Sequence, residues 1–168
     1  MYDELTQVDI DKMNEEIAYR KTVLRPKLIE DVQTARGFGD LSENFEYKCA
    51  KRDKNRNDSR IRYLERMVAT AKVIDSRSAD NGAVALFSKV TLLNEKPQKE
   101  QPIRIVTSLR QNALKGLISK ESPVGRALLG HRAGDRVEIT VNPEMKYTVV
   151  IRSVEPGEDD ASLDISAY

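Results

Sequence analysis

The feature that most constrains the fold is a pair of helix-like patterns that flank one short stretch containing Gly37 and Gly39. In the first pattern, mostly apolar residues recur at spacings of three, four or seven, at Ile10, Met13, Ile17, Leu24, Leu28 and Ala35. In the second, a strict three-four alternation forms a heptad seam of Tyr47, Ala50, Lys54, Asn57, Ile61, Leu64, Val68 and Ala71. Two helices joined by so short a link must lie antiparallel, and the glycines permit the sharp reversal. We therefore predict a helical hairpin with arms of roughly 30 residues, on the order of 45 Å long.

Two features modify this hairpin. Pro26 lacks a backbone donor, so it should kink or restart the first helix. Lys54 and Asn57 make the second seam polar midway, which weakens the seam but can fix its register. So thin a hairpin must project from a larger body, with its turn as the most distant point.

Charge is distributed unevenly along the chain although the formal net charge is only +1. Residues 1–16 contain six acids and one base, whereas residues 48–66 contain eight bases and three acids. A solvated helix face and a basic arm that faces phosphates both fit this asymmetry. The only histidine is His131 and the only cysteine is Cys49, which leaves almost no material for histidine-based metal or triad chemistry and none for an internal disulfide. With no long apolar run, we expect a cytoplasmic protein.

The pattern changes from about Val73 onward. Alternating or β-branched stretches predict strands at residues 88–94, 103–109, 135–142 and 146–154. The stretch around Ser122 and Pro123 predicts one short helix closed by Gly130, and "NEKPQKEQP" predicts a polar surface loop. The fold class expected is therefore α+β, with a hairpin at 1–75 and a compact domain at 80–155. The acidic residues 156–168 are expected to be a disordered tail.

The hairpin turn at residues 37–46 contains two acids, Asp40 and Glu43. The spacing of "DLSE" fits a capping box, with Ser42 as an alternative N-cap. A functional interpretation is also open, because Mg²⁺ often takes only one or two carboxylates from a protein and completes its shell elsewhere. Phe38 and Phe45 flank the turn, and we favour mutual packing of the two rings over base stacking.

The stretch "ARGFGDLSENFEYKCAK" resembles the signature of the bacterial Gre transcript cleavage factors (GreA/GreB), whose turn reads Ala-Arg-x-x-Gly-Asp-Leu-Ser-Glu-Asn-x-Glu-Tyr. The second-helix stretch "RIRYLERMVATAKVID" and the later stretch "KGLISKESPVGRALLGHRAGD" resemble other parts of that family. The matches together span most of residues 25–140.

The resemblance implies an N-terminal antiparallel coiled coil and a C-terminal FKBP-like domain. It implies a monomeric transcription elongation factor that enters the secondary channel of bacterial RNA polymerase and is not itself an enzyme. There it would stimulate the polymerase's own cleavage of backtracked RNA. The expected partners are the polymerase, the 3′ end of the nascent RNA and, as a further candidate, DNA of the same complex, with no membrane.

The resemblance also assigns site residues. Asp40 and Glu43 would assist in the polymerase active site and help hold a shared Mg²⁺, with no cofactor belonging to the chain alone. Four residues would shape the turn: Gly39, Leu41, Ser42 and Asn44. Three basic residues would contact RNA or polymerase: Arg36, Lys48 and Arg52. The chain departs from the family where Asp9 replaces a frequent glycine, where Thr107 replaces another, and at Asn142–Pro143.

Three rival functions remain to be weighed. The first is a channel-binding paralogue that inhibits transcription without cleavage, against which "GDLSEN" argues. The second is a prolyl isomerase or chaperone, which needs an aromatic pocket, although residues 80–155 contain only Phe87 and Tyr147 as aromatics. The third is a scaffold that pairs its coiled coil with another, which the polar seam disfavours.

Overall fold

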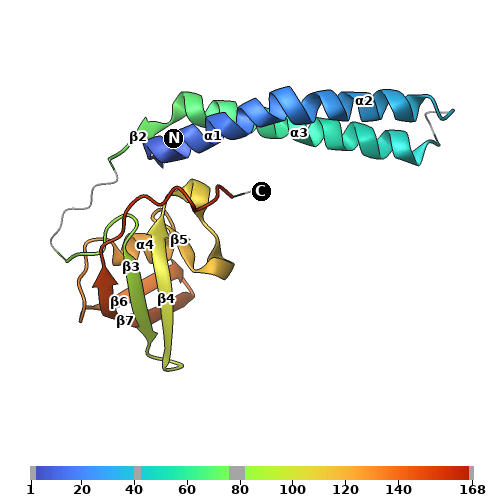
Figure 1. Cartoon of the computed structure of the whole chain (residues 1–168). Helices are drawn as coiled ribbons and strands as arrows, with labels where there is room; N and C mark the ends of the chain where they lie inside the picture. Colours follow the sequence, from blue (N-terminus) through green and yellow to red (C-terminus); the bar gives the residue numbers. More distant parts are fainter. Residues whose placement is uncertain (1–2, 40–42, 76–81, 167–168) are drawn as a thin grey trace. The chain divides into compact units, whose positions relative to one another are not determined.

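The computed structural model describes residues 3–39, 43–75 and 82–166, and these divide into two compact units (Figure 1). One unit contains Ile10–Ala71, and the other contains Glu4–Asp9 together with the chain from Lys72 onward. Residues 4–9 and 72–75, which the sequence placed with the hairpin, thus belong to the second unit. The reason is a short parallel pair formed by β1 (Glu4–Leu5) and β2 (Lys72–Val73). A helical hairpin followed by a β-sheet domain confirms the α+β prediction.

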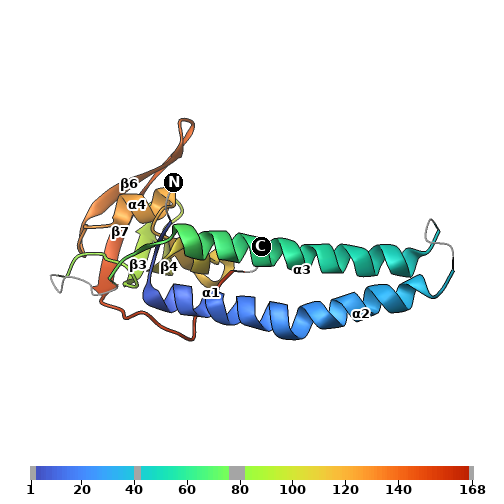
Figure 2. The same cartoon turned by 90° about the horizontal axis from the view of Figure 1, so that it is seen from above.

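The hairpin is built from three helices and a π-helical turn. Helix α1 spans Gln7–Tyr19, the π-helical turn spans Arg20–Leu24, α2 spans Arg25–Arg36 and α3 spans Phe45–Thr70. Pro26 lies in the first turn of α2, directly after the π-helical turn, so the regular α-helix is interrupted where the proline was expected to disturb it, although the chain stays helical throughout. Helices α2 and α3 run side by side in Figures 1 and 2. The 26 residues of α3 correspond to about 39 Å. Among the described residues, no helix is long and apolar enough to cross a membrane.

The seam of the hairpin follows the predicted positions. Met13, Ala35, Ile61 and Leu64 are all buried. The polar middle of the seam is also buried, because Asn57 is only 3% exposed. Its amide accepts a hydrogen bond from Arg20 Nη1 at 3.0 Å and donates one to the Arg20 carbonyl at 3.4 Å. The polar position thus has a cross-helix partner, as a register-fixing residue requires.

Next to Asn57, a carboxylate joins the two arms. Glu16 accepts hydrogen bonds from Arg20 at 2.7 Å and from Arg60 at 3.0 and 3.2 Å. Burial raises the pKa of Glu16, but the hydrogen bonds from Arg60 and Arg20, with their charges, outweigh it and leave the pKa below its ordinary value. Part of the acid-rich and base-rich asymmetry seen in the sequence is therefore used to pair the helices with one another.

The second unit contains a five-stranded sheet in the order β5-β4-β3-β7-β6. Its strands are β3 (Lys89–Asn94), β4 (Lys99–Val106), β5 (Leu117–Ser119), β6 (Arg136–Asn142) and β7 (Met145–Glu155). Within this five-stranded sheet only the β4–β5 pair is parallel. Helix α4 (Pro123–Leu128) begins at its predicted cap, because Ser122 Oγ accepts from the Gly125 N–H at 3.0 Å. Leu128 packs in a core with Ile105, Ile139 and Ile151.

Some strand boundaries differ from the prediction. Strand β4 already begins at Lys99, so the polar loop is confined to the turn at residues 95–98. The same strand ends at Val106, where Ser108–Arg110 form a 3₁₀ turn. Thr107 has a φ of −66°, which any residue can adopt, so the position does not require a glycine. The strands β1, β2 and β5 were missed because two or three residues are too few to show alternation.

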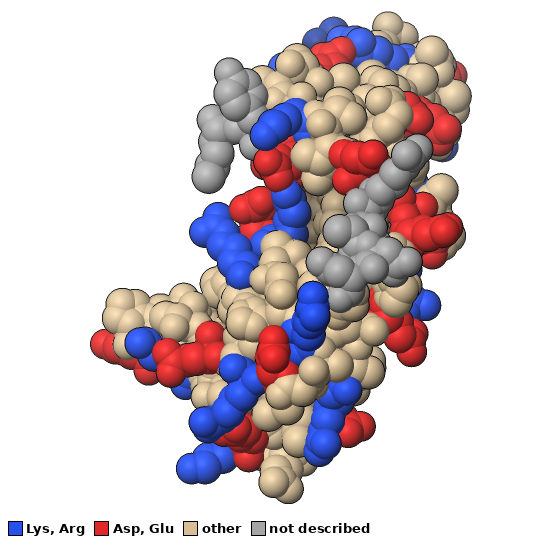
Figure 3. All heavy atoms as spheres, turned by 90° about the vertical axis from the view of Figure 1, so that its left-hand side faces the viewer, with Lys and Arg blue, Asp and Glu red and all other residues tan. Residues whose placement is uncertain are grey.

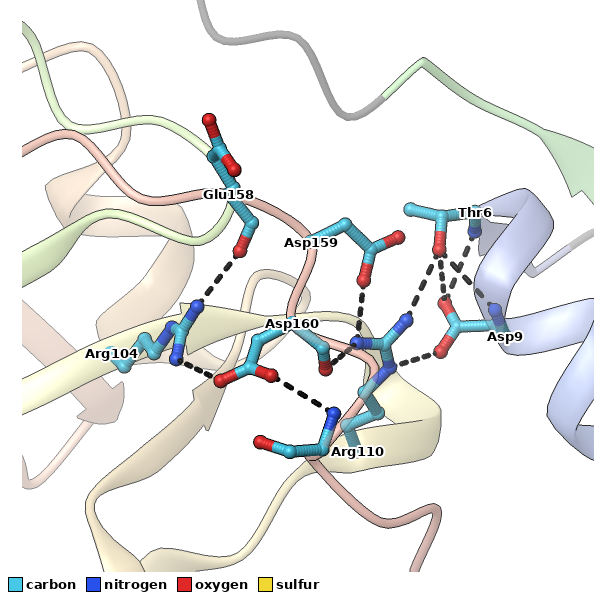
Figure 4. A network of polar contacts seen from close by, with 8 residues as sticks. Thr6, Asp9, Arg104, Arg110, Glu158, Asp159 and Asp160 are labelled. Atoms are coloured by element: carbon cyan, nitrogen blue, oxygen red, sulfur yellow. Dashed lines mark hydrogen bonds and ion pairs between the residues drawn. The ribbon is translucent and has the colours of Figure 1, made fainter.

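A buried charge network lies in the second unit (Figure 4), centred on Arg110, whose side chain is fully buried. Its guanidinium bonds to Asp9 Oδ1 at 2.5 Å and to Thr6 Oγ1 at 3.2 Å. It also pairs with Asp159 Oδ1 at 2.6 Å and donates to the Asp160 carbonyl at 3.1 Å. We refer to Thr6, Asp9, Arg110, Asp159 and Asp160 as the Arg110 cluster. It ties the N-terminal segment and the C-terminal segment to the sheet domain.

The C-terminal segment differs from the disordered tail expected from composition. Residues 156–166 are described, and Arg104 donates to the Glu158 carbonyl at 2.8 Å while pairing with the Asp160 carboxylate at 3.5 Å. Further on, the Ser166 N–H donates to the Leu109 carbonyl at 2.7 Å. Two of the acids that made this segment look like a tail, Asp159 and Asp160, pair with Arg110 and Arg104, which lie far away in the chain.

Candidate functional site

The hairpin tip, residues 36–48, lies between the end of α2 and the first turn of α3. The structure describes residues 36–39 and 43–48 of it. After α2 ends at Arg36, the N–H groups of Gly37 and Phe38 donate to the carbonyls of Thr34 and Ala35 at 3.0 and 3.2 Å. Gly39 has a φ of +118°, outside the range that other residues adopt readily. The glycine expected to shape the turn thus occupies a position that requires glycine.

The Asn44 side chain forms hydrogen bonds to both helices at the tip. Its side-chain oxygen accepts from the Tyr47 N–H at 3.0 Å, so Asn44 is the N-cap of α3. Its amide nitrogen also donates to the Ala35 carbonyl at 2.7 Å, which joins the end of α2 to the start of α3. One side chain therefore satisfies a backbone donor of one helix and a backbone acceptor of the other.

This cap corrects the capping-box interpretation of "DLSE". Because α3 begins at Phe45 with Asn44 as its N-cap, Glu43 lies before the cap and not in the first turn of the helix. Glu43 is exposed, and the acid that occupies the first turn is Glu46. The other predicted tip residues, Asp40, Leu41 and Ser42, lie outside the described residues. Capping of α3 therefore does not explain why position 43 is occupied by an acid.

An aromatic ring with two cations follows the cap. The Arg36 guanidinium lies 5.7 Å and the Lys51 ammonium 5.9 Å from the centre of the Tyr47 ring. A hydrogen bond from Arg36 lowers the pKa of the Tyr47 hydroxyl below its ordinary value against the opposing effect of burial, and the charges of Lys51 and Arg36 add to the lowering. This arrangement links the last residue of α2 to the second turn of α3.

The three predicted contact residues are all exposed. Arg36 is held against Tyr47, and Lys48 lies one residue further along α3. Arg52 keeps 65% of its side chain exposed and lies 3.6 Å from Asp53, a distance typical of a weak surface pair. The structure thus brings together Arg36, Tyr47 and Lys51, whereas Arg52 lies further along the helix.

Glu43 is an exposed acid of the tip whose carboxylate is available to a metal ion. Among the described residues, no group of three or more histidine, cysteine or acidic side chains could hold a metal ion. An exposed carboxylate such as Glu43 offers the hard oxygen ligand that Mg²⁺ prefers. The donor chemistry of this carboxylate fits Mg²⁺.

The two phenylalanines overturn the expectation of mutual packing. Phe38 is 67% exposed and Phe45 is 76% exposed, so neither ring buries most of its surface against the other. Elsewhere the sequence missed the Arg110 cluster altogether. Its one sequence signal was Asp9 at a position where glycine is frequent in the family that the chain resembles, and Asp9 proves to be the buried partner of Arg110.

Comparison with known proteins identifies the family. The model described as "Transcription elongation factor, N-terminal" matches residues 4–73, and the model described as "Transcription elongation factor, GreA/GreB, C-term" matches residues 79–156. The chain belongs to the GreA/GreB family of transcription elongation factors. The GreA/GreB match covers both the hairpin with its tip and the sheet domain, so the predicted resemblance is confirmed over most of the chain.

Individual GreA relatives agree with this assignment. The transcription elongation factor GreA of Mesoplasma florum is 35% identical over 150 residues, which cover 89% of this chain and 96% of the relative. GreA of Geobacillus kaustophilus is 37% identical over 147 residues, covering 87% and 93%. Among solved structures, the transcription factor Gfh1 is 22% identical and covers 92% of this chain and 97% of its own, with a TM-score of 0.46. Because that TM-score is below 0.5, the GreA/GreB assignment rests on the sequence matches.

Proposed function

We propose that this protein stimulates RNA polymerase to cleave backtracked nascent RNA, and that the polymerase supplies the active site. The observation that carries the proposal is Glu43, exposed at the turn of a thin antiparallel hairpin and placed before the helix cap. Asp40, three residues earlier, would be the second acid. The membership in a family of transcription elongation factors supports RNA polymerase as the partner.

The geometry of the hairpin supports delivery of these acids into a narrow space. Two paired helices form a much thinner element than a globular domain, and α3 alone is about 39 Å long. The paired Arg20, Asn57 and Glu16 stiffen its middle, and Asn44 closes its end. A stiff arm reduces the conformational entropy that is lost when its end is held in one place.

The chemistry would be shared between the two proteins. When bound, a second Mg²⁺ would stabilise the attacking and leaving oxygens of an in-line phosphodiester displacement. Glu43 and Asp40 would provide oxygen ligands that raise the occupancy of this ion. Carboxylate oxygens can also accept a hydrogen bond from a water molecule and so orient it. The chain would then be an activator of another active site and not an enzyme in its own right.

The prolyl isomerase alternative lacks support in the sheet domain. Phe87 is fully buried, with the Arg110 and Arg104 guanidinium groups 5.2 and 6.0 Å from its ring centre. Tyr147, the other aromatic residue considered for such a pocket, lies in β7 and is 37% exposed. Phe87 is closed to a ligand, and the pocket that Tyr147 lines has otherwise polar or charged walls, including Glu95 and Arg136.

The test is a cleavage assay on backtracked complexes of RNA polymerase with end-labelled RNA. Wild-type protein should shorten the RNA, and the variant Asp40→Asn with Glu43→Gln should lose on the order of 100-fold of that stimulation, as loss of groups that support a metal site does. Glu30→Gln is the matched control, because Glu30 is an exposed acid of α2 outside the tip and the turn signature, so its loss should leave cleavage intact.

Binding must be measured in the same experiment. The double variant should still bind the complex, since its arm and sheet domain are unchanged. Equal cleavage by the double variant and the wild type would show that the tip acids are dispensable. Wild-type protein that binds and slows elongation without shortening the RNA would instead support the inhibitory paralogue.

A further inference from the structure

Phe38 and Phe45 stand on the two sides of the tip turn with most of their surface in water. Phe38 follows the end of α2 and is 67% exposed, and Phe45 opens α3 and is 76% exposed. Both occupy positions that the turn signature leaves open, so the tip does not need aromatic residues in order to fold. Two large exposed apolar groups at one place favour a contact surface over a structural role.

The backbone beneath both rings is fixed. The Phe38 N–H donates to the Ala35 carbonyl at 3.2 Å, and Phe45 is the first helical residue after the Asn44 cap. Asn44 in turn bonds to Ala35 at 2.7 Å, so the two attachment points are tied to each other. Presenting the rings to a ligand therefore costs little conformational entropy beyond that of the side chains themselves.

The charges around the rings point to the chemistry of the ligand. Four cations on the tip and the next turn of α3 are exposed, namely Arg36, Lys48, Lys51 and Arg52. Cations interleaved with aromatic rings are typical of surfaces that bind single-stranded nucleic acid, where the cations follow the phosphates and the rings stack on bases. An apolar protein partner would call for the rings but would gain little from so many cations beside them.

We propose that Phe38 and Phe45 form a stacking platform for nucleobases at the 3′ end of the single-stranded RNA on which the tip acts. This inference rests on the proposed function and adds how the tip recognises its substrate. Every base presents a π-face, so the platform tolerates any sequence. By holding the RNA end beside the turn, the rings keep the scissile region close to the carboxylates and leave the cleavage chemistry to them.

The first test uses fluorescence and does not depend on cleavage. A backtracked complex carries 2-aminopurine as the 3′ base, and the added protein contains Asp40→Asn and Glu43→Gln so that the RNA stays whole. Stacking on the rings should quench the fluorescence. The same protein with Phe38→Leu and Phe45→Leu, which keep apolar bulk but remove the rings, should leave the fluorescence of the complex unchanged.

The second test compares cleavage of RNA with and without a 3′ base. With the acids intact, Phe38→Leu with Phe45→Leu should reduce cleavage of normal RNA on the order of 10-fold, the scale of one lost stacking contact. An abasic 3′ nucleotide should reduce cleavage by the wild type to a similar extent. The leucine variant acting on abasic RNA should cleave no more slowly than it cleaves normal RNA, because the variant and the abasic nucleotide remove the same contact.

Two results would contradict the proposal that Phe38 and Phe45 stack on RNA bases. The first is that the leucine variant quenches 2-aminopurine as well as the parent does. The second is that the leucine variant binds backtracked and non-backtracked complexes equally poorly, which would place the rings against the polymerase and not the RNA. The comparison of abasic with normal RNA uses wild-type protein, so its result does not depend on whether a variant folds. Failure of the proposed function itself would appear separately, as wild-type protein that never shortens RNA.

Discussion

The hairpin tip and the Arg110 cluster both set a cation against an aromatic ring, but they do so in opposite environments. At the tip, Arg36 lies 5.7 Å from the Tyr47 ring centre and remains exposed. In the cluster, Arg110 lies 5.2 Å from the Phe87 ring centre and is fully buried with Asp9 and Asp159 (Figure 4). Water solvates the first arginine, whereas the second depends wholly on its protein partners.

The comparison separates charges that hold the fold from charges that a partner can use. A buried ion must be paired, so removal of one partner leaves the other unsatisfied and costly. An exposed ion gains little from a neighbour and can exchange water for a new ligand. Most charged residues in the described parts of the chain are exposed, and in Figure 3 acidic and basic side chains are interspersed over the face shown.

The largest effect is expected from breaking the Arg110 cluster. Arg110→Met leaves the Asp9 and Asp159 carboxylates without their buried cation, so it should lower the free energy of unfolding by about 3–5 kcal/mol. Chemical denaturation of the purified protein measures this. Arg126→Met is the matched control, because Arg126 is 64% exposed and its loss should change stability by less than about 0.5 kcal/mol. Equal effects of the two substitutions on the free energy of unfolding would contradict the distinction between buried and exposed charges.

An intermediate effect is expected from the half-buried Glu16 pair in acid. Because its pKa is lowered in the folded state, Glu16 stabilises the protein fully above the ordinary glutamate pKa of about 4.3 and loses that contribution as the pH falls through the folded value. Thermal melts from pH 7 to pH 3 should therefore fall less steeply for Glu16→Gln than for the wild type. Parallel curves would mean that Arg20 and Arg60 do not stabilise the ionised carboxylate.

The smallest effect on stability is expected at the tip. Asp40→Asn with Glu43→Gln should change the free energy of unfolding by less than about 0.5 kcal/mol, because Glu43 is exposed and Asn44 already caps α3. The same denaturation measurement used for Arg110→Met provides the comparison. A loss as large as that of a helix cap, about 1 kcal/mol, would mean that the acids hold the turn as well.

The sequence predicted those parts of the molecule that short-range patterns control. Three features each depend on residues a few positions away: the positions of Ile61 and Leu64 in the seam, the interruption of the α-helix near Pro26, and the cap at Ser122. Prediction failed where several local solutions compete. At the tip, "DLSE" offered a plausible capping box, but the helix begins after Asn44, which also reaches the Ala35 carbonyl in the other arm.

What the sequence determined by itself is the hairpin, the location of its turn and the family to which the chain belongs. Tertiary structure alone decided that Arg110 is buried against Asp9, 101 positions away, and that the acidic C-terminal residues lie against the same arginine. Tertiary structure also decided that Phe38 and Phe45 remain exposed. Periodicity is fixed by the geometry of one helix or strand, whereas burial and charge pairing depend on which distant segments the completed fold brings together.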